Sequence, residues 1–361
     1  MSFIDRLGLS VPILQAPMAG VSTPALAAAV CNAGALGAIG LGATDATGAH
    51  EMIAQVRART TRPFNVNLFV HAPPRHDLAR QAAWLAWLQP QFTRFGVAPP
   101  DGLHPPYTSF VDDPDMLHML LVARPSVISF HFGLPAPAKL AALRGTGAVL
   151  LASVTSLAEA HMAEQAGLDA VIAQGMEAGG HRGVFDPAAP DDGLGVVALT
   201  RLLASRGHCP VVAAGGIMDG AGVAVMLALG AVAAQMGTAF VPCPESAADA
   251  PYRQALLGPA AYHTRLTTCI SGRPARTLPN HFTALTDEGE TPLPPDYPLA
   301  YAAGKALHAA AKAVGVSGFG AQWAGQGAPL ARVMPAAQLV RTVQAELAEE
   351  QRLLLARARG G

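Results

Sequence analysis

The chain alternates short apolar runs with longer stretches rich in Ala and Leu, and this alternation restricts its fold more than any other feature. The apolar runs have the length of strands, and most lack a polar residue at every second position, which is typical of parallel strands buried on both faces. Eight such runs cover residues 12–16, 36–40, 64–69, 127–130, 149–152, 170–173, 211–214 and 232–236. The pattern predicts an α/β fold, namely a (β/α)8 TIM barrel with a smaller capping subdomain, and an open doubly wound sheet is the alternative.

Two segments interrupt the alternation. Residues 71–121 form an insertion between the third and fourth expected strands, and loops of that length after a barrel strand usually serve the active-site face. After residue 244 the chain becomes rich in Pro and Gly. We therefore expect a barrel over residues 1–244, completed by a C-terminal helix within 331–361, and a capping substrate subdomain over 245–330.

Composition excludes several classes of protein. Hydrophobic residues make up 51% of the chain and charged residues 14%, and the net charge is −1 with no basic tract, so neither nucleic acid nor a membrane is an expected partner. The uncharged run 220–244 is divided by Gly230 into a helical and a strand-like half, which argues against a membrane span. Four scattered cysteines and the lack of a secretory signal predict a cytoplasmic protein, which we expect to be a monomer or a weak homodimer.

Chemically suggestive residues fall at the ends of six of the eight expected strands. They are 15–18, Asn67, His131, 174–182, 215–217 and 235–238. Barrels of this kind keep their active sites at the carboxyl ends of the strands, so these residues are expected to share one site.

One of these strands runs into Gly179, Gly180 and His181. Glycines without a Cβ would let a flat ring lie on the main chain, and histidine titrates near neutral pH. The alternative is an ordinary turn with an incidental surface histidine. The small-residue turns after the seventh and eighth strands expose backbone N–H groups, which favours a phosphate-bearing cofactor.

Five motifs occur in the order seen in FMN-dependent nitronate monooxygenases. They are Gln-Ala-Pro-Met-Ala-Gly at 15–20, Phe-Asn-Val-Asn at 64–67, Ala-Gly-Gly-His-Arg-Gly at 178–183, Ala-Ala-Gly-Gly-Ile at 213–217 and Gln-Met-Gly-Thr at 235–238. The chain resembles this family from about residue 11 to about residue 329. The runs 297–305 and 323–326 are similar to the bacterial class I branch.

The resemblance implies bound FMN and a set of residues that contact it. That set is Ala16, Met18, Asn67, Gln174, Gly179, Gly180, Gly215, Gly216, Gln235, Met236, Gly237 and Thr238. The side-chain amides can donate to and accept from the polar edge of a flavin, and the glycines and threonine of the last two turns suit its phosphate. The alternative interpretation of Met18 is a methionine that packs in the hydrophobic core.

The resemblance also implies two active-site histidines and a polar substrate pocket. His181 matches the residue that takes the α-proton of a neutral nitroalkane, and His131 matches a second active-site histidine, with a structural hydrogen bond behind the strand as its alternative. Tyr107, Tyr297, Tyr301 and Lys305 resemble the substrate-binding wall. The last three also share one helical face, so packing or a solvated lysine would explain them as well.

The other histidines, including His71, His76, His161 and His308, have no metal-ligand spacing, so no metal is expected and we interpret them as surface or structural residues.

The function implied is FMN-dependent oxidation of alkyl nitronates with O2 to a carbonyl compound and nitrite, with propionate 3-nitronate as the suggested natural substrate and detoxification as the role. Three alternatives stay open: a flavin-dependent enoyl-thioester reductase or NAD(P)H:quinone reductase on the same barrel, a phosphate-binding barrel without flavin such as an isomerase, and a non-catalytic binding protein.

Overall fold

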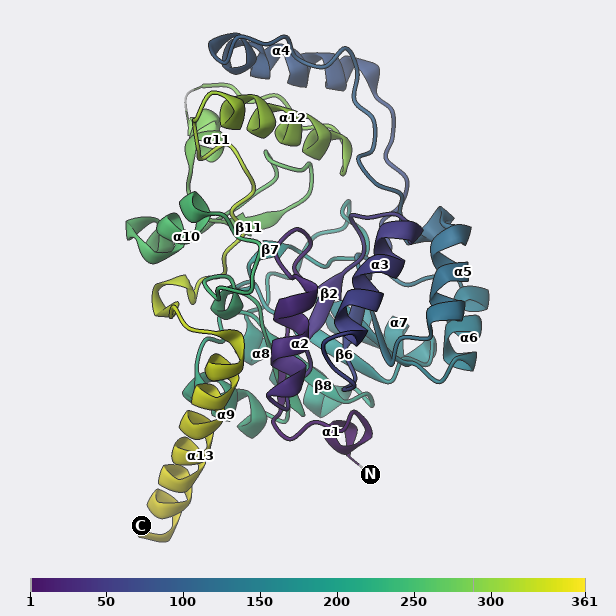
Figure 1. The fold of residues 1–361 in the computed structure, drawn as a ribbon, viewed down its shortest axis with the longest axis vertical. Helices are drawn as coiled ribbons and strands as arrows, with labels where there is room; N and C mark the ends of the chain where they lie inside the picture. Colours follow the sequence, from purple (N-terminus) through teal and green to yellow (C-terminus); the bar gives the residue numbers. More distant parts are fainter. Residues whose placement is uncertain (1, 288, 361) are drawn as a thin grey trace.

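The computed structural model describes residues 2–287 and 289–360, and within them eight parallel strands form a single sheet (Figure 1). The sheet order is β1-β9-β8-β6-β5-β4-β3-β2, and a parallel bridge between Leu14 and Leu36 brings its two edges together. The strands are β1 (Ile13–Gln15), β2 (Ala38–Gly40), β3 (Asn65–Phe69), β4 (Val127–His131), β5 (Val149–Val154), β6 (Ala170–Gln174), β8 (Val211–Ala214) and β9 (Ala233–Met236). The barrel prediction is confirmed, and the doubly wound alternative is wrong.

Alternation along the strands divides the apolar residues between two cores. Leu151, Ile172 and Val212 fill the barrel interior. They pack there with Phe3 of the short helix α1 (Phe3–Arg6) and with Leu7, which directly follows that helix. Their strand neighbours, such as Val171, face the surrounding helices instead. Because both faces are buried, the strands show no polar alternation in the sequence.

A ring of helices surrounds the sheet. Its members are α2 (Pro24–Asn32), α3 (Ala46–Arg57), α5 (Pro114–Ala123), α6 (Pro137–Gly145), α7 (Leu157–Gln165), α8 (Val196–Arg206) and α9 (Gly220–Ala228). Side chains of Thr23, Asp45, Asp113, Ser156 and Asp219 cap the N-termini of five of them. The C-terminal helix α13 (Ala336–Gly360) packs against α9 and α2 through Leu339, Val340 and Val343.

The inserted segment is shorter than the sequence predicted. Helix α5 packs between α3 and α6, so residues 114–121, which we placed in the insertion, belong to the outer ring. The inserted part proper carries α4 (Leu78–Arg94), whose Trp84, Leu88 and Phe92 pack against α12 (Leu299–Ala313). Figure 1 shows these two helices side by side, beyond one end of the barrel.

A small antiparallel sheet joins the barrel to residues 245–330. Its order is β10-β11-β7, with β10 (Arg265–Thr267), β11 (Ala275–Thr277) and β7 (Gly180–His181). Strand β7 follows barrel strand β6 by only a few residues, so the Gly180–His181 segment is held by the later part of the chain. The short helices α10 (Ala250–Leu257) and α11 (His281–Ala284) complete this region. Among the described helices, none is long and apolar enough to span a membrane.

Candidate active site

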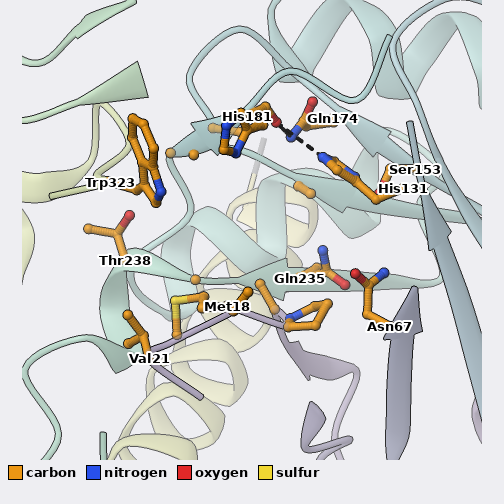
Figure 2. Close-up of a pocket in the computed structure, with 18 of the residues that line it drawn as sticks. Met18, Val21, Asn67, His131, Ser153, Gln174, His181, Gln235, Thr238 and Trp323 are labelled. Carbon is orange, nitrogen blue, oxygen red and sulfur yellow. Dashed lines mark hydrogen bonds between the residues drawn. The ribbon is translucent and has the colours of Figure 1, made fainter. Parts of the chain in front are cut away.

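A cavity of about 310 Å³ lies between the carboxyl ends of the barrel strands and the segments above them. The barrel side is lined by residues from β3, β4, β5, β6, β8 and β9 and from the turns after β1, β8 and β9. The upper side is lined by Tyr107, Tyr252, Tyr301, Lys305 and Trp323. Figure 2 shows Met18, Asn67 and Gln235 on one side of this space and His181 with Trp323 on the other.

The strand ends on the barrel side present polar atoms to the cavity. Gln235 on β9 has a buried Oε1 atom for which the described residues supply no hydrogen-bond partner. Asn67 on β3 donates from Nδ2 to the Oγ (2.8 Å) and main-chain oxygen (3.1 Å) of Ser129, which fixes the orientation of its amide. Buried polar atoms are normally paired, so the free Gln235 oxygen indicates a place where a ligand supplies the donor.

The turns after β8 and β9 bring main chain to the cavity wall. Gly215 and Gly216 have φ angles of +134° and +68°, which glycine adopts without strain. A Cβ at Gly237 would lie 3.3 Å from the Cβ of Ala16. Thr238 accepts a hydrogen bond from the Gly325 amide at 3.0 Å, so this turn is tied to the segment that carries Trp323.

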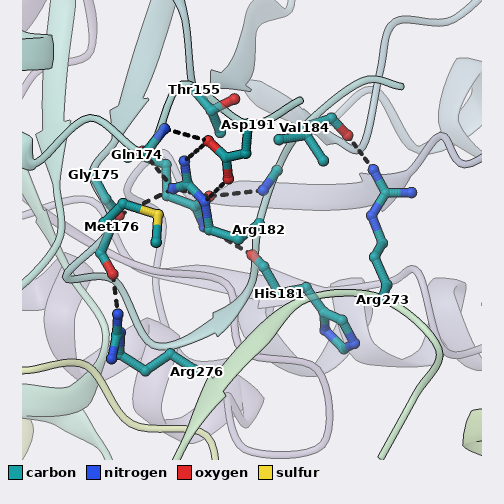
Figure 3. Close-up of polar contacts among 12 residues, drawn as sticks. Thr155, Gln174, Gly175, Met176, His181, Arg182, Val184, Asp191, Arg273 and Arg276 are labelled. Atoms are coloured by element: carbon teal, nitrogen blue, oxygen red, sulfur yellow. Dashed lines mark hydrogen bonds and ion pairs between the residues drawn. The ribbon is translucent and has the colours of Figure 1, made fainter. Parts of the chain in front are cut away.

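The loop between β6 and β7 is fixed by an internal network (Figure 3). Arg182, only 1% exposed, forms an ion pair with Asp191 (2.7 Å) and donates to the main-chain oxygen of Gln174 (2.9 Å). The Gln174 side chain donates to the His181 carbonyl (2.9 Å) and accepts from the Gly183 amide (2.7 Å). Both polar atoms of the Gln174 side-chain amide, Nε2 and Oε1, therefore already hydrogen bond within the loop that carries His181.

Gly179 allows the loop to pass under a second piece of main chain. A Cβ at this position would lie 2.5 Å from the Gly325 nitrogen, so no larger residue fits without displacing backbone. Gly180 has a φ of +75° and pairs with Arg276 of β11. The two glycines thus serve close backbone packing in addition to lining the cavity.

His181 projects from β7 into a ring of aromatic side chains. Its imidazole centroid lies 4.9 Å from that of Trp323, 5.2 Å from Tyr297 and 6.0 Å from Tyr301. Its Nε2 atom is 2.9 Å from Oγ of Ser271. Desolvation by these neighbours lowers the pKa of His181 well below the ordinary histidine value, and His131, Arg273 and His71 lower it further. The imidazole is therefore neutral at pH 7 and able to accept a proton.

His131, at the end of β4, also lines the cavity and is also held neutral. Its Nε2 donates to the His181 carbonyl at 3.2 Å, since a carbonyl can only accept. Burial, followed by the charge of Arg273, lowers the pKa of His131 to about 4. The residue thus makes the structural hydrogen bond that the sequence left as an alternative, while its ring still borders the cavity.

The upper wall combines phenols with one lysine. The Tyr107 and Tyr297 hydroxyls hydrogen bond to each other. Burial raises the pKa values of both these residues and that of Tyr301, the last to about 12, so all three phenols stay protonated. The Nζ of Lys305 lies 5.3 Å from the Tyr107 ring centroid and 5.0 Å from that of Tyr301. Lys305 is exposed, and it places a positive charge at the rim of the cavity.

Known proteins give an independent view of this chain. The family model described as nitronate monooxygenase matches residues 2–346. The chain belongs to the nitronate monooxygenase family. The nitronate monooxygenases of Paraburkholderia phytofirmans and Pseudomonas aeruginosa are 58% and 56% identical to it over 346 residues, covering 96% of this chain and 94% and 98% of theirs.

A solved structure supports the same relationship. The nitroalkane oxidase from Streptomyces ansochromogenes superimposes with a TM-score of 0.89 at 40% identity, covering 98% of this chain and all of that one. The resemblance to nitronate monooxygenases inferred from the motifs is confirmed, and the chain is an oxidoreductase of this family. Its placement in the class I branch stays a prediction.

Most residues that the motifs singled out in this family member border one cavity. Two do not: Met236 lies in the apolar layer between β9 and the helices, and Tyr297 packs beside His181 without appearing in the cavity wall. His76 and His161 are exposed, whereas His71 is 3% exposed and its ring centroid lies 4.9 Å from that of Tyr297, so His71 has the structural one of the two positions expected for these histidines. Burial lowers its pKa to about 4. The described residues contain no cluster of groups able to hold a metal.

Several site residues escaped the sequence analysis. Trp323, Ser153, Val21 and Tyr252 line the cavity, and Tyr252 donates its hydroxyl proton to the Trp323 carbonyl. Trp323 begins one of the two later motif runs, Ser153 lies near the end of β5, and Val21 directly follows the motif at 15–20, so each of these had a signal in the sequence. Tyr252 had none, because it lies in α10 and reaches the cavity only through long-range packing.

Proposed function

We propose that this chain oxidises alkyl nitronates with O2, using FMN, and releases a carbonyl compound and nitrite. The observation that carries the proposal is the pairing of two unlike walls around one cavity. The barrel wall offers main-chain turns and amide groups, and the upper wall offers a neutral histidine, phenols and a lysine. Family membership supports this assignment.

The barrel wall fits FMN in two respects. The unpartnered Oε1 of Gln235 suits an N–H donor of a flavin ring, and the turns at Gly215–Gly216 and Gly237–Thr238 suit a phosphate, because main-chain N–H groups without side chains favour a dianion. Asn67 and Met18 would lie along the ring, with Ala16, Gly179 and Gly180 completing the surface. Bound FMN supplies the redox chemistry, which none of the lining side chains provides.

The upper wall accounts for substrate binding and proton transfer. A nitronate is an anion, so phenol hydroxyls and the Lys305 ammonium offer it donors. A neutral nitroalkane must first lose its α-proton, and the neutral imidazole of His181 is able to accept it. The aromatic rings around His181 exclude water from this step.

Propionate 3-nitronate is the natural substrate we favour, because Lys305 at the rim gives its carboxylate a partner. The biological role would then be detoxification. In this proposal, residues 1–244 with the C-terminal helix hold the cofactor, and residues 245–330 supply the substrate wall.

Product analysis in air tests the proposal. The purified protein should convert the nitronate of nitroethane to acetaldehyde and nitrite while consuming O2, without NAD(P)H. Turnover of a quinone or an enoyl thioester with NAD(P)H, and no nitrite from nitronates, would contradict the proposal and favour a reductase. Release of neither product, despite bound ligand, would point to a binding protein.

A further inference from the structure

The turn Ser271-Gly272-Arg273 lies behind His181 and is absent from the cavity wall. Ser271 is 1% exposed, and its Oγ is 2.9 Å from Nε2 of His181 and 3.1 Å from the main-chain oxygen of Arg273. A hydroxyl has one proton, and a carbonyl oxygen can only accept. When the Ser271 proton satisfies the Arg273 carbonyl, Oγ accepts from Nε2–H of His181. The Nδ1 atom of His181 then carries the free lone pair.

Gly272 holds this turn in place. Its φ is +85°, and a Cβ there would lie 2.2 Å from the Pro295 oxygen and 3.0 Å from the Tyr297 nitrogen. The turn is therefore packed tightly against the main chain that leads into α12. The Ser271 hydroxyl is consequently presented to His181 from a fixed backbone.

Arg273 adds a positive charge to the same place. It is 3% exposed, and its guanidinium lies 4.2 Å from the centroid of the Phe132 ring, which is itself 5.7 Å from the His181 ring. It donates to the Val184 carbonyl (Figure 3), but the described residues offer its Nε atom no hydrogen-bond acceptor. Within residues 2–287 and 289–360, no carboxylate forms an ion pair with it. The carboxylates of Glu159 and Asp186 favour its charge only from beyond ion-pair distance. A buried cation without a direct ion pair costs folding free energy, and such groups are concentrated at functional sites.

We propose that the Ser271–Arg273 turn positions His181 for catalysis: the Ser271 hydroxyl fixes the Nε2–H tautomer, and the Arg273 guanidinium favours the neutral, proton-accepting ring. The inference rests on the proposed function, because it assigns His181 the proton-accepting role there. Ser271 and Arg273 are positioning residues, since they act on the reaction through His181.

Each ionisable group around His181 either lowers the pKa of its imidazole or is itself a protonated, neutral phenol. His131 from β4, Arg273 from the turn and His71 from the segment after β3 each lower the pKa of His181, after the larger effect of desolvation. Tyr297 and Tyr301 are protonated phenols, because burial raises their pKa values. Of these groups, Arg273 is the one that carries a full charge at pH 7, even though burial lowers its pKa to about 10.

A histidine NMR titration of the flavin-loaded protein tests the charge effect without turnover. The His181 resonance is identified by its loss in His181→Asn. Arg273→Met should raise the titration midpoint of His181 by roughly one pH unit, as expected for loss of a nearby like charge. If Arg273→Met does not fold, Arg273→Gln replaces it, because glutamine keeps a donor for the Val184 carbonyl, and the same rise in midpoint is expected. Arg273→Lys should keep the wild-type midpoint.

Arg276→Met is the matched control, because Arg276 is also buried and lies three residues further along, donating to the Met176 carbonyl. It should leave the His181 midpoint unchanged. An unchanged midpoint in both Arg273→Met and Arg273→Gln, or an equal rise in Arg276→Met, would overturn the role of Arg273.

The tautomer is tested by imidazole ¹⁵N shifts of the same samples. Wild type should show His181 protonated at Nε2, and Ser271→Ala should show a mixture of the two tautomers. A wild-type ring protonated at Nδ1, or no change in Ser271→Ala, would overturn the role of Ser271. These readouts need no nitronate, so failure of the positioning role is distinguishable from failure of the proposed function, which is read from nitrite.

Discussion

The two walls of the cavity are built in different ways. On the barrel wall, each functional residue stands at the end of its own strand or in the turn that follows, as Asn67, Gln235 and Gly216 do. The upper wall is assembled from the insertion, β7 with His181, helices α10 and α12, and the segment around residue 323. Local sequence therefore fixes the first wall, whereas only the packing of distant segments creates the second.

The two walls also differ in chemistry. The barrel wall is rich in main chain and amides and suits a cofactor that stays bound. The upper wall is aromatic and carries the groups that titrate or bear charge, His181 and Lys305. Damage to the barrel wall should therefore remove the cofactor, whereas damage to the upper wall should change which substrates are turned over.

The largest effect is expected from Gly216→Val on the barrel wall. Gly216 has a φ of +68°, and its Cβ would lie 3.2 Å from the Cβ of Glu177, so valine would distort the turn proposed to hold the phosphate. The variant should purify without flavin, as measured by the ratio of flavin to protein absorbance. Gly102→Val is the control, because Gly102 is exposed with nothing within 4 Å of its Cβ position. Full flavin occupancy in Gly216→Val would refute the phosphate assignment.

The next effect concerns the upper wall and proton transfer. General-base catalysis contributes roughly 10²- to 10⁴-fold, so His181→Asn should lose that much kcat/KM on neutral nitroethane. It should retain far more activity on the nitronate, which has already lost the proton. His161→Asn, an exposed histidine, should affect neither substrate. Equal losses on both forms would mean that His181 only positions substrate or flavin.

Lys305→Met should have a smaller effect that depends on the substrate. A charge-assisted hydrogen bond contributes about 1.5 to 3 kcal/mol, and the exposed position of Lys305 argues for the lower end, about tenfold in binding. KM should rise by about that factor for propionate 3-nitronate and much less for the nitronate of nitroethane. Lys312→Met, on the same helix and exposed, is the control. An unchanged preference would show that Lys305 is only a solvated residue.

The smallest effect is expected from removing one phenol hydroxyl of the cavity wall, Tyr301→Phe. A neutral hydrogen bond contributes about 1 kcal/mol, so KM for both nitronates should rise roughly five-fold without changing the preference between them. Tyr262→Phe, in an exposed residue, should leave KM unchanged. A change confined to one nitronate would assign the Tyr301 hydroxyl to the substrate tail.

The sequence predicted one wall better than the other for physical reasons. Parallel strands buried on both faces leave long apolar runs, and their carboxyl ends must meet, so the strands and Asn67, Gln174 and Gln235 could be predicted together. Ser271 and Arg273 could not, because they reach His181 only through the pairing of β7 with β11, which joins residues about 95 positions apart. The end of the insertion was misplaced because α5 is apolar and capped like any other helix in the ring.

The anaerobic visible spectrum of the purified protein tests the central claim most directly. The protein should carry the absorption bands of oxidised flavin, and adding the nitronate of nitroethane without O2 should bleach them, whereas NAD(P)H should not. Readmission of air should restore the bands and release nitrite. A colourless protein, or a flavin bleached by NAD(P)H and untouched by nitronate, would contradict the account.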